Sequence, residues 1–117
     1  MRVLAVEDDT VVLMDIADML EALGMECLEA SSAEQALKIF GDGAQIDLVL
    51  ADLGLPGMSG ADFVREIARR SPRTPIILCT GSDTSEHADL SDYDRLEKPF
   101  AAGQLAQALK QAVPETA

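Results

Sequence analysis

The sequence is short of positive charge, with nine Lys and Arg residues against 21 Asp and Glu, so its formal net charge is −12. Binding to nucleic acid without sequence preference needs Lys and Arg to displace counterions from phosphates, and this deficit argues against it. The same deficit argues against docking on an anionic membrane surface. A bound metal ion or a cationic partner is easier to reconcile with this charge.

Long apolar runs and cysteines are also scarce. No run approaches the ~20 residues that span a bilayer, and the strand pattern begins at Val3. We therefore expect neither a membrane span nor a targeting segment. Cys27 and Cys79 fall within predicted strands and should be reduced thiols that act as small hydrophobic residues. These features favour a cytoplasmic protein with one domain over residues 1–117.

Short apolar runs alternate with helical patterns, which is typical of repeated βα units around a parallel sheet. The predicted strands are Val3–Val6, Glu26–Ala30, Ile46–Ala51, Ile76–Cys79 and Arg95–Glu97. The predicted helices are about Thr10–Leu23, the stretch from the capping-box pattern at Ser31–Gln35 to Phe40, Gly60–Arg70 and Gly103–Val113. The stretch Gly81–Asp94 is polar and weakly patterned. We expect a fourth helix there to be short or irregular, with two turns at most.

Polar residues stand at the carboxyl ends of four predicted strands. The acidic run 7–9 follows the first strand, Asp52 the third, Thr80 the fourth and Lys98 the fifth. Ligands of an open parallel sheet bind beyond the carboxyl ends of its strands, so these residues should share one site. Asp52 is the most informative of them, because a carboxylate between a buried strand and a Pro/Gly-rich loop is placed for chemistry rather than for packing.

Three carboxylates at adjacent strand ends make a hard oxygen site, which suits Mg²⁺ with some waters retained. Asp8, Asp52 and a backbone carbonyl just after Asp52 are candidate direct ligands, and the longer Glu7 could reach the metal through water. Lys98 and Thr80 would leave a gap for a phosphoryl group. The Asp52 carboxylate can itself be the nucleophile and become an aspartyl-phosphate.

Each of these residues also has an ordinary structural interpretation. Asp8 or Asp9 could simply cap the first helix, and Asp52 could be a turn residue. Thr80 could fill a strand, and Lys98 could be a solvated charge. Their joint occurrence, in order and at successive strand ends, favours the functional interpretation.

Taken together, these residues make the chain resemble the receiver domains of two-component response regulators over essentially its whole length. The matching motifs are Glu7-Asp8, Asp52 with the loop Leu55–Gly60, Thr80-Gly81 and Lys98-Pro99-Phe100. The resemblance implies an α/β fold with a flavodoxin-like, doubly wound, five-stranded parallel sheet of order 2-1-3-4-5. It also implies Mg²⁺-dependent transfer of a phosphoryl group from the phosphohistidine of a sensor histidine kinase to Asp52.

The resemblance further implies the roles of the site residues. Those that hold Mg²⁺, directly or through water, would be Glu7, Asp8, Asp52 and the Gly54 carbonyl. Those that bind the phosphoryl oxygens would be Thr80 and Lys98. We expect a stand-alone signalling domain, not an enzyme acting on other substrates. It would act as a monomer or weak dimer through protein binding or phosphate shuttling, without nucleic acid.

Two features depart from the family pattern. The position three residues before Lys98, usually aromatic, holds Arg95, and only seventeen residues (81–97) separate Thr80 from Lys98. The usual relay between Thr and an aromatic residue is therefore not expected, and the pattern is similar to that of stand-alone receivers of α-proteobacteria. Two alternatives stay open. One is a pseudo-receiver that binds partners without phosphorylation. The other is an Mg²⁺-dependent phosphatase with an aspartate nucleophile, although its usual second Asp is replaced here by Gly54.

The first predicted helix leaves Met14 on the side opposite its apolar stripe. Single exposed apolar residues are common, but Met14 with Leu13 and Ala17 could form a small adaptable patch, a use that suits Met. Receiver domains that resemble this chain present this helix to the helical bundle of the kinase. We therefore expect this patch to contact the kinase.

Overall fold

The computed structural model of the chain describes residues 1–43, 45–55, 57–80, 93–98 and 100–112. Its elements in chain order are β1 (Arg2–Val6), α1 (Thr10–Ala22), β2 (Glu26–Ala30), α2 (Ala33–Gly41), β3 (Leu48–Asp52), α3 (Gly60–Arg70), β4 (Ile76–Thr80), β5 (Asp94–Glu97) and α4 (Ala102–Ala112). The strands pair in parallel in the order β2-β1-β3-β4-β5. The flavodoxin-like α/β prediction is confirmed. In the part of the chain that the structure describes, no helix is long and apolar enough to cross a membrane.

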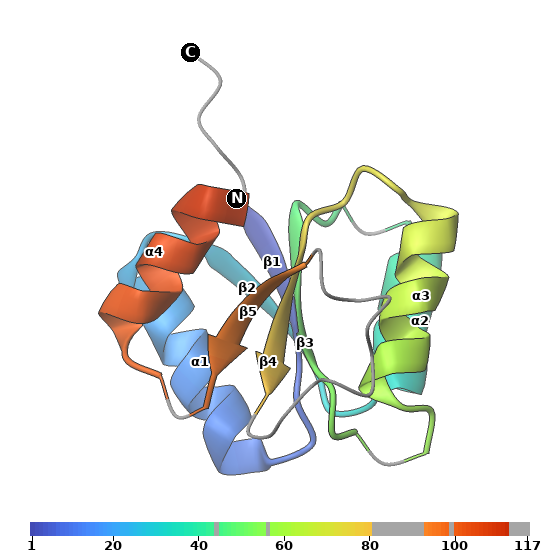
Figure 1. Ribbon diagram of the computed structural model, residues 1–117, viewed down its shortest axis with the longest axis horizontal. Coiled ribbons are helices and arrows are strands. Elements are labelled where there is room, and N and C mark those ends of the chain that lie inside the picture. Colours follow the sequence, from blue (N-terminus) through green and yellow to red (C-terminus); the bar gives the residue numbers. More distant parts are fainter. Residues whose placement is uncertain (44, 56, 81–92, 99, 113–117) are drawn as a thin grey trace.

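The sheet is covered by helices on both faces, α1 and α4 on one side and α2 and α3 on the other (Figure 1). Successive strand residues point to opposite faces, so each strand supplies both cores. The core under α2 and α3 includes Leu4, Val49, Leu78, Phe63 and Ile67. The core under α1 and α4 includes Val3, Leu50, Ile77, Leu20 and Leu105. All five residues of β3 and all five of β4 are buried, as expected for strands covered on both faces.

Backbone pairing continues one residue past the ends of β1 and β5, and this fixes the positions of two site residues. The Glu7 N–H donates to the Ala30 carbonyl at 3.0 Å, and the Lys98 N–H donates to the Thr80 carbonyl at 2.8 Å. Asp52 is itself the last residue of β3, in register with Cys79. Glu7, Asp52 and Lys98 therefore lie close to one another in register, at the carboxyl ends of the strands.

The packing of α1 corrects one sequence prediction. Met14 is 57% exposed as expected, but Leu13 and Ala17 are buried and do not extend a surface patch around it. With Ile16 and Leu20 they form a stripe at spacings of three and four residues that faces the sheet. The helix is therefore rotated slightly from the orientation that such a patch would require, and Leu13 belongs to the core.

Three other predicted features differ or fall outside the described residues. Ile46 and Asp47 precede β3 and are not part of it, although Asp47 and Arg2 exchange hydrogen bonds through the Asp47 N–H (2.8 Å) and Oδ2 (2.7 Å). The expected short or irregular fourth helix would lie within residues 81–92, which the structure does not describe. The same holds for Val113. Cys27 and Cys79 are both free thiols, as predicted.

Candidate functional site

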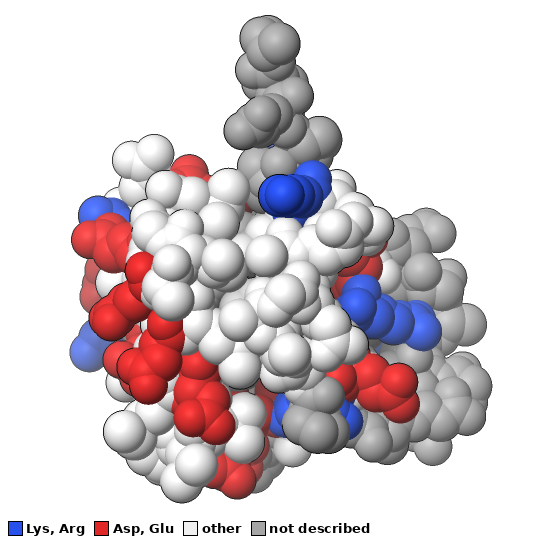
Figure 2. Space-filling view, turned by 90° about the vertical axis from the view of Figure 1, so that its left-hand side faces the viewer, with Lys and Arg blue, Asp and Glu red and all other residues white. Residues whose placement is uncertain are grey.

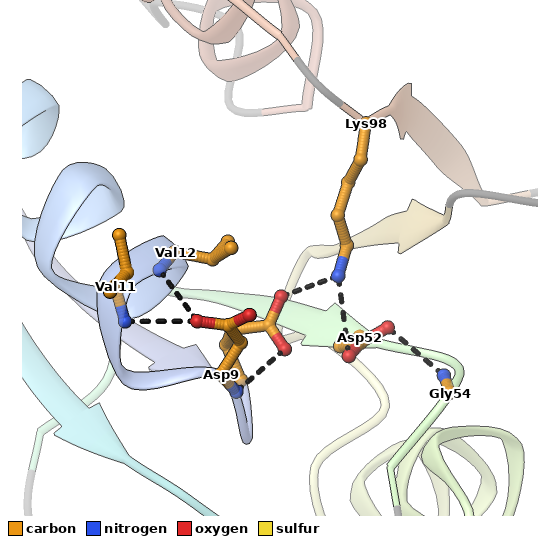
Figure 3. Close-up of polar contacts among 7 residues, drawn as sticks. Asp9, Val11, Val12, Asp52, Gly54 and Lys98 are labelled. Atoms are coloured by element: carbon orange, nitrogen blue, oxygen red, sulfur yellow. Dashed lines mark hydrogen bonds and ion pairs between the residues drawn. The ribbon is translucent and has the colours of Figure 1, made fainter.

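Asp52 lies at the centre of the polar cluster at the carboxyl edge of the sheet. Its side chain is buried, with a residue exposure of 6%. Its Oδ1 accepts the Gly54 N–H at 3.0 Å, and its Oδ2 lies 3.3 Å from Lys98 Nζ (Figure 3). The next backbone N–H, that of Leu53, donates to the Cys79 carbonyl at 3.2 Å. Both the carboxylate and the peptide that carries it are therefore held in place.

Glu7 is buried even more deeply, at 1% exposure. One of its oxygens, Oε1, forms an ion pair with Lys98 Nζ, and the other, Oε2, accepts the Asp9 N–H at 3.3 Å. Burial, reinforced by a contact with Asp52, raises the pKa of Glu7 to about 7, although the Lys98 ammonium acts in the opposite direction. A second negative charge beside Asp52 is thus costly in the metal-free protein.

The two neighbouring aspartates Asp8 and Asp9 have different roles. Asp9 is the N-cap of α1, and its Oδ1 accepts the N–H groups of Val11 (3.0 Å) and Val12 (3.3 Å) (Figure 3). An Asp in this position satisfies donors that the first turn of a helix cannot pair. Asp8 is exposed, and its carboxylate lies within 4.8 Å of those of Glu7 and Asp52. The capping interpretation thus applies to Asp9, and Asp8 faces the site.

Lys98 connects the two buried carboxylates, because its ammonium group contacts both Glu7 and Asp52. Burial alone would lower the pKa of Lys98, but the ion pairs with these two carboxylates outweigh it and raise the pKa. Thr80 is also buried and ends the neighbouring strand. The predicted residues therefore converge: Glu7, Asp8, Asp52 and Lys98 lie together, and Thr80 is joined to Lys98 through the backbone.

This arrangement fits a hard divalent cation. Three carboxylates within 4.8 Å of one another repel, and an oxygen-preferring cation would allow all three to stay ionised. Asp8 is exposed, so the cluster meets solvent on its side, and Mg²⁺ keeps several waters when it binds. Lys98 supplies a positive charge in contact with Glu7 and Asp52, where a phosphoryl group on Asp52 would need one.

A hollow of about 130 Å³, which was not predicted from the sequence, lies beside this site. Its wall is mostly apolar, and Lys98 belongs both to the hollow and to the acidic cluster. The lining residues are Val12, Asp15, Ile16, Met19, Lys98 and Phe100. The only indication of this hollow in the sequence is the aromatic Phe100, two residues after Lys98. That Phe100 packs toward α1 could not be predicted from the sequence.

The sequence and the fold both match known proteins. The family model of the response regulator receiver domain matches residues 3–110 of the sequence. The sensor kinase/phosphatase LuxN of Vibrio campbellii is 33% identical over 110 residues, which cover 92% of this chain and 13% of LuxN. The chain spans between 13% and about half of the length of such curated relatives.

Two solved structures have the same fold. A receiver domain protein from Clostridium thermocellum superposes with a TM-score of 0.87 at 34% identity, covering 95% of this chain and 92% of that one. The response regulator TrrA of Thermotoga maritima, in complex with Mg²⁺ and BeF, superposes with a TM-score of 0.88 at 28% identity. That match covers 96% of this chain and 98% of TrrA.

Replacing Asp8 with Asn should weaken Mg²⁺ binding by tenfold or more while leaving the fold intact or slightly more stable. An amide oxygen is a poorer ligand for a hard cation than a carboxylate, and the loss of one of three crowded charges relieves repulsion in the metal-free protein. Isothermal titration with Mg²⁺ and urea unfolding without metal measure the two effects.

Asp9→Asn is the matched control, since Asn is an equally good N-cap and Asp9 does not belong to the cluster. It should bind Mg²⁺ nearly as the parent does. Equal loss of affinity in both variants would mean that overall charge, and not the position of Asp8, governs the binding.

The stability of the metal-free protein should fall as the pH rises from about 4.5 to about 7. Because the pKa of Glu7 is raised to about 7 in the folded state, the folded protein binds more protons than the unfolded chain in this window, and linkage makes unfolding easier as the pH rises. Urea unfolding with EDTA at several pH values should show a slope that flattens above pH 7. The slope should be smaller in Glu7→Gln, and an unchanged slope there would assign it to another group.

Proposed function

Because the chain belongs to the response regulator receiver domain family, we propose that Asp52 accepts a phosphoryl group from the phosphohistidine of a sensor histidine kinase. Receiver domains are signalling domains and not classical enzymes. The observation that carries this proposal for the present chain is the convergence of Glu7, Asp8 and Lys98 on the Asp52 carboxylate.

In the proposed transfer, a carboxylate oxygen of Asp52 donates an electron pair to phosphorus. The P–N bond to the donor imidazole breaks with its electrons going to nitrogen, and the product is an acyl phosphate on Asp52. The ammonium of Lys98, which contacts two carboxylates in the metal-free protein, would turn to a phosphoryl oxygen. The Thr80 hydroxyl would donate to another oxygen of the same group.

We propose that Asp8, Asp52 and the Gly54 carbonyl hold Mg²⁺, with Glu7 acting through water. When bound, Mg²⁺ supplies positive charge that offsets the repulsion between the phosphoryl oxygens and the carboxylates. TrrA, which has this fold, was solved in complex with Mg²⁺ and BeF, and this supports a Mg²⁺ site in the present chain.

Incubation with acetyl phosphate and Mg²⁺ should phosphorylate the parent chain stoichiometrically on Asp52 alone. Asp52→Asn has nearly the same shape but is not nucleophilic, so it should carry no label under any condition. Intact-mass and peptide mass spectrometry measure both results. Phosphate found on Glu7 or Asp9 would contradict the mechanism.

The same experiment separates the two alternatives. A pseudo-receiver would take no label although its fold is intact. A phosphatase with an aspartate nucleophile would release phosphate over many turnovers without accumulating a stoichiometric acyl phosphate. Asp62→Asn, in the exposed first turn of α3, serves as a control that should be labelled like the parent.

The surface beside the site suits contact with a helix of the phosphodonor. Met14 is 57% exposed on one flank of α1. On the other flank of this helix, the apolar hollow between α1 and Phe100 shares Lys98 with the site. In Figure 2, which faces α1 and α4, acidic side chains gather at the left and along the bottom of this face, with a smaller group at the lower right, and its centre is largely uncharged. The exposed Asp15 and Asp18 lie next to Met14 along α1. A donor helix with apolar and basic side chains would complement this surface.

Met14→Lys should slow transfer from a histidine kinase that phosphorylates the parent by more than tenfold. A charged side chain in the apolar contact must be desolvated without a partner, whereas the pocket around Asp52 is unchanged. Labelling by acetyl phosphate should therefore stay at the parental rate. Rates with the two donors, measured side by side, test the prediction.

Ala22→Lys adds the same charge at the exposed far end of the same helix and is the matched control. It should affect neither donor. If Met14→Lys slows both donors equally, Met14 has a structural role and the contact surface lies elsewhere.

A further inference from the structure

Gly60, the first residue of α3, is packed directly against the backbone that carries Asp52. A Cβ atom built on Gly60 would lie 1.9 Å from the Asp52 carbonyl oxygen, 2.5 Å from the Leu53 Cα and 2.7 Å from the Asp52 carbonyl carbon. Real Cβ atoms essentially never come within 3.0 Å of such atoms. All three are backbone atoms, so no side-chain rotation can relieve the overlap.

The peptide that Gly60 contacts is held from two sides. Its carbonyl oxygen faces Gly60, and its N–H, on Leu53, donates to the Cys79 carbonyl of β4. The next N–H, on Gly54, donates to Asp52 Oδ1. The start of α3 therefore adds to the contacts with β4 and with the loop after Asp52 that hold this carboxylate in position.

The helix cannot easily move away to make room for a side chain. Phe63, Val64 and Ile67 of α3 are fully buried in the core under this helix, and the Ser59 hydroxyl oxygen accepts the Asp62 N–H at 3.1 Å as the N-cap. A methyl group at position 60 would thus displace the backbone from Asp52, the last residue of β3, to Gly54. This stretch carries both the Asp52 carboxylate and the Gly54 carbonyl.

We propose that Gly60 is a positioning residue for phosphoryl transfer, because the absence of a side chain lets the first turn of α3 set the position of the Asp52–Gly54 backbone. This inference rests on the proposed function of Asp52. Gly60 touches neither metal nor phosphoryl group and acts only through the peptide of Asp52. A displacement of about 1 Å at a reacting group can lower a rate by about a hundredfold.

Gly60→Ala should lower the rate of labelling by acetyl phosphate, at saturating Mg²⁺ and per folded molecule, by about a hundredfold. Its apparent affinity for Mg²⁺ should fall as well, because the Gly54 carbonyl moves with the loop. Circular dichroism in the same buffer gives the folded fraction, and quenched-flow labelling with tryptic mass spectrometry gives the rate. Raising the concentration of Mg²⁺ or acetyl phosphate should not restore the parental maximum rate.

Two controls separate position from stability. Gly103→Ala adds the same methyl group to the first turn of α4, where nothing lies within 4 Å of the new atom, and should be labelled like the parent. Ile67→Val removes a buried methyl group from α3 without touching the loop. It should be less stable yet be labelled at the parental rate per folded molecule.

If folded Gly60→Ala reaches the parental rate per folded molecule, the role of Gly60 is structural only and the inference is wrong. Should Gly60→Ala fail to fold, Ser59→Ala gives the second test, since it removes the cap that fixes the start of α3 and should slow labelling by about three- to tenfold. Parental labelling of Ser59→Ala would then overturn the inference. If the parent and Gly103→Ala both take no label, it is the proposed function that fails.

Discussion

The structure of the site depends on one shared ammonium group. Glu7 and Asp52 are both buried, and Lys98 contacts both. Without this ammonium group, two carboxylates would lie together in a poorly solvated pocket. Burying an unpaired ion in this way costs about several kcal/mol of folding free energy. A cluster of this kind is not a source of stability, because apolar residues of similar volume would serve the fold at least as well. The proposed phosphoryl transfer gives a reason for its presence.

This constraint determines how the fold is used. The ion pairs of Lys98 with Glu7 and Asp52 form only if the strands that lead to these residues are in register. The pairing of β1 with β3 and of β4 with β5 ensures this, with backbone hydrogen bonds from Glu7 and Lys98 to the neighbouring strands. The two cores of the sheet hold the strands in that register. The apolar residues thus supply the stability that the site itself does not.

Much of this could be predicted from the sequence, because parallel topology brings strand ends together whatever the loops do. Asp52, Glu7 and Lys98 were identified from their positions after apolar runs. The division between Asp8 and Asp9 could not be predicted, since either could cap α1 and only the start of the helix decides. The burial of Leu13 could not be predicted for a related reason, because a rotation of α1 by a fraction of a turn moves a residue from the surface to the core.

The role of Gly60 illustrates a constraint that local sequence patterns do not reveal. The residues around Gly60 predict an ordinary helix start, and the backbone of Gly60 is not in the left-handed region that favours glycine. What requires a glycine is the close approach of two backbone segments that are eight residues apart in sequence, which appears only once α3 is seated on its core. The apolar stripe of α3 buries Phe63 and Ile67 and so seats the helix on its core. The separate contact of Gly60 with the peptide of Asp52 is possible at that position only because residue 60 carries no side chain.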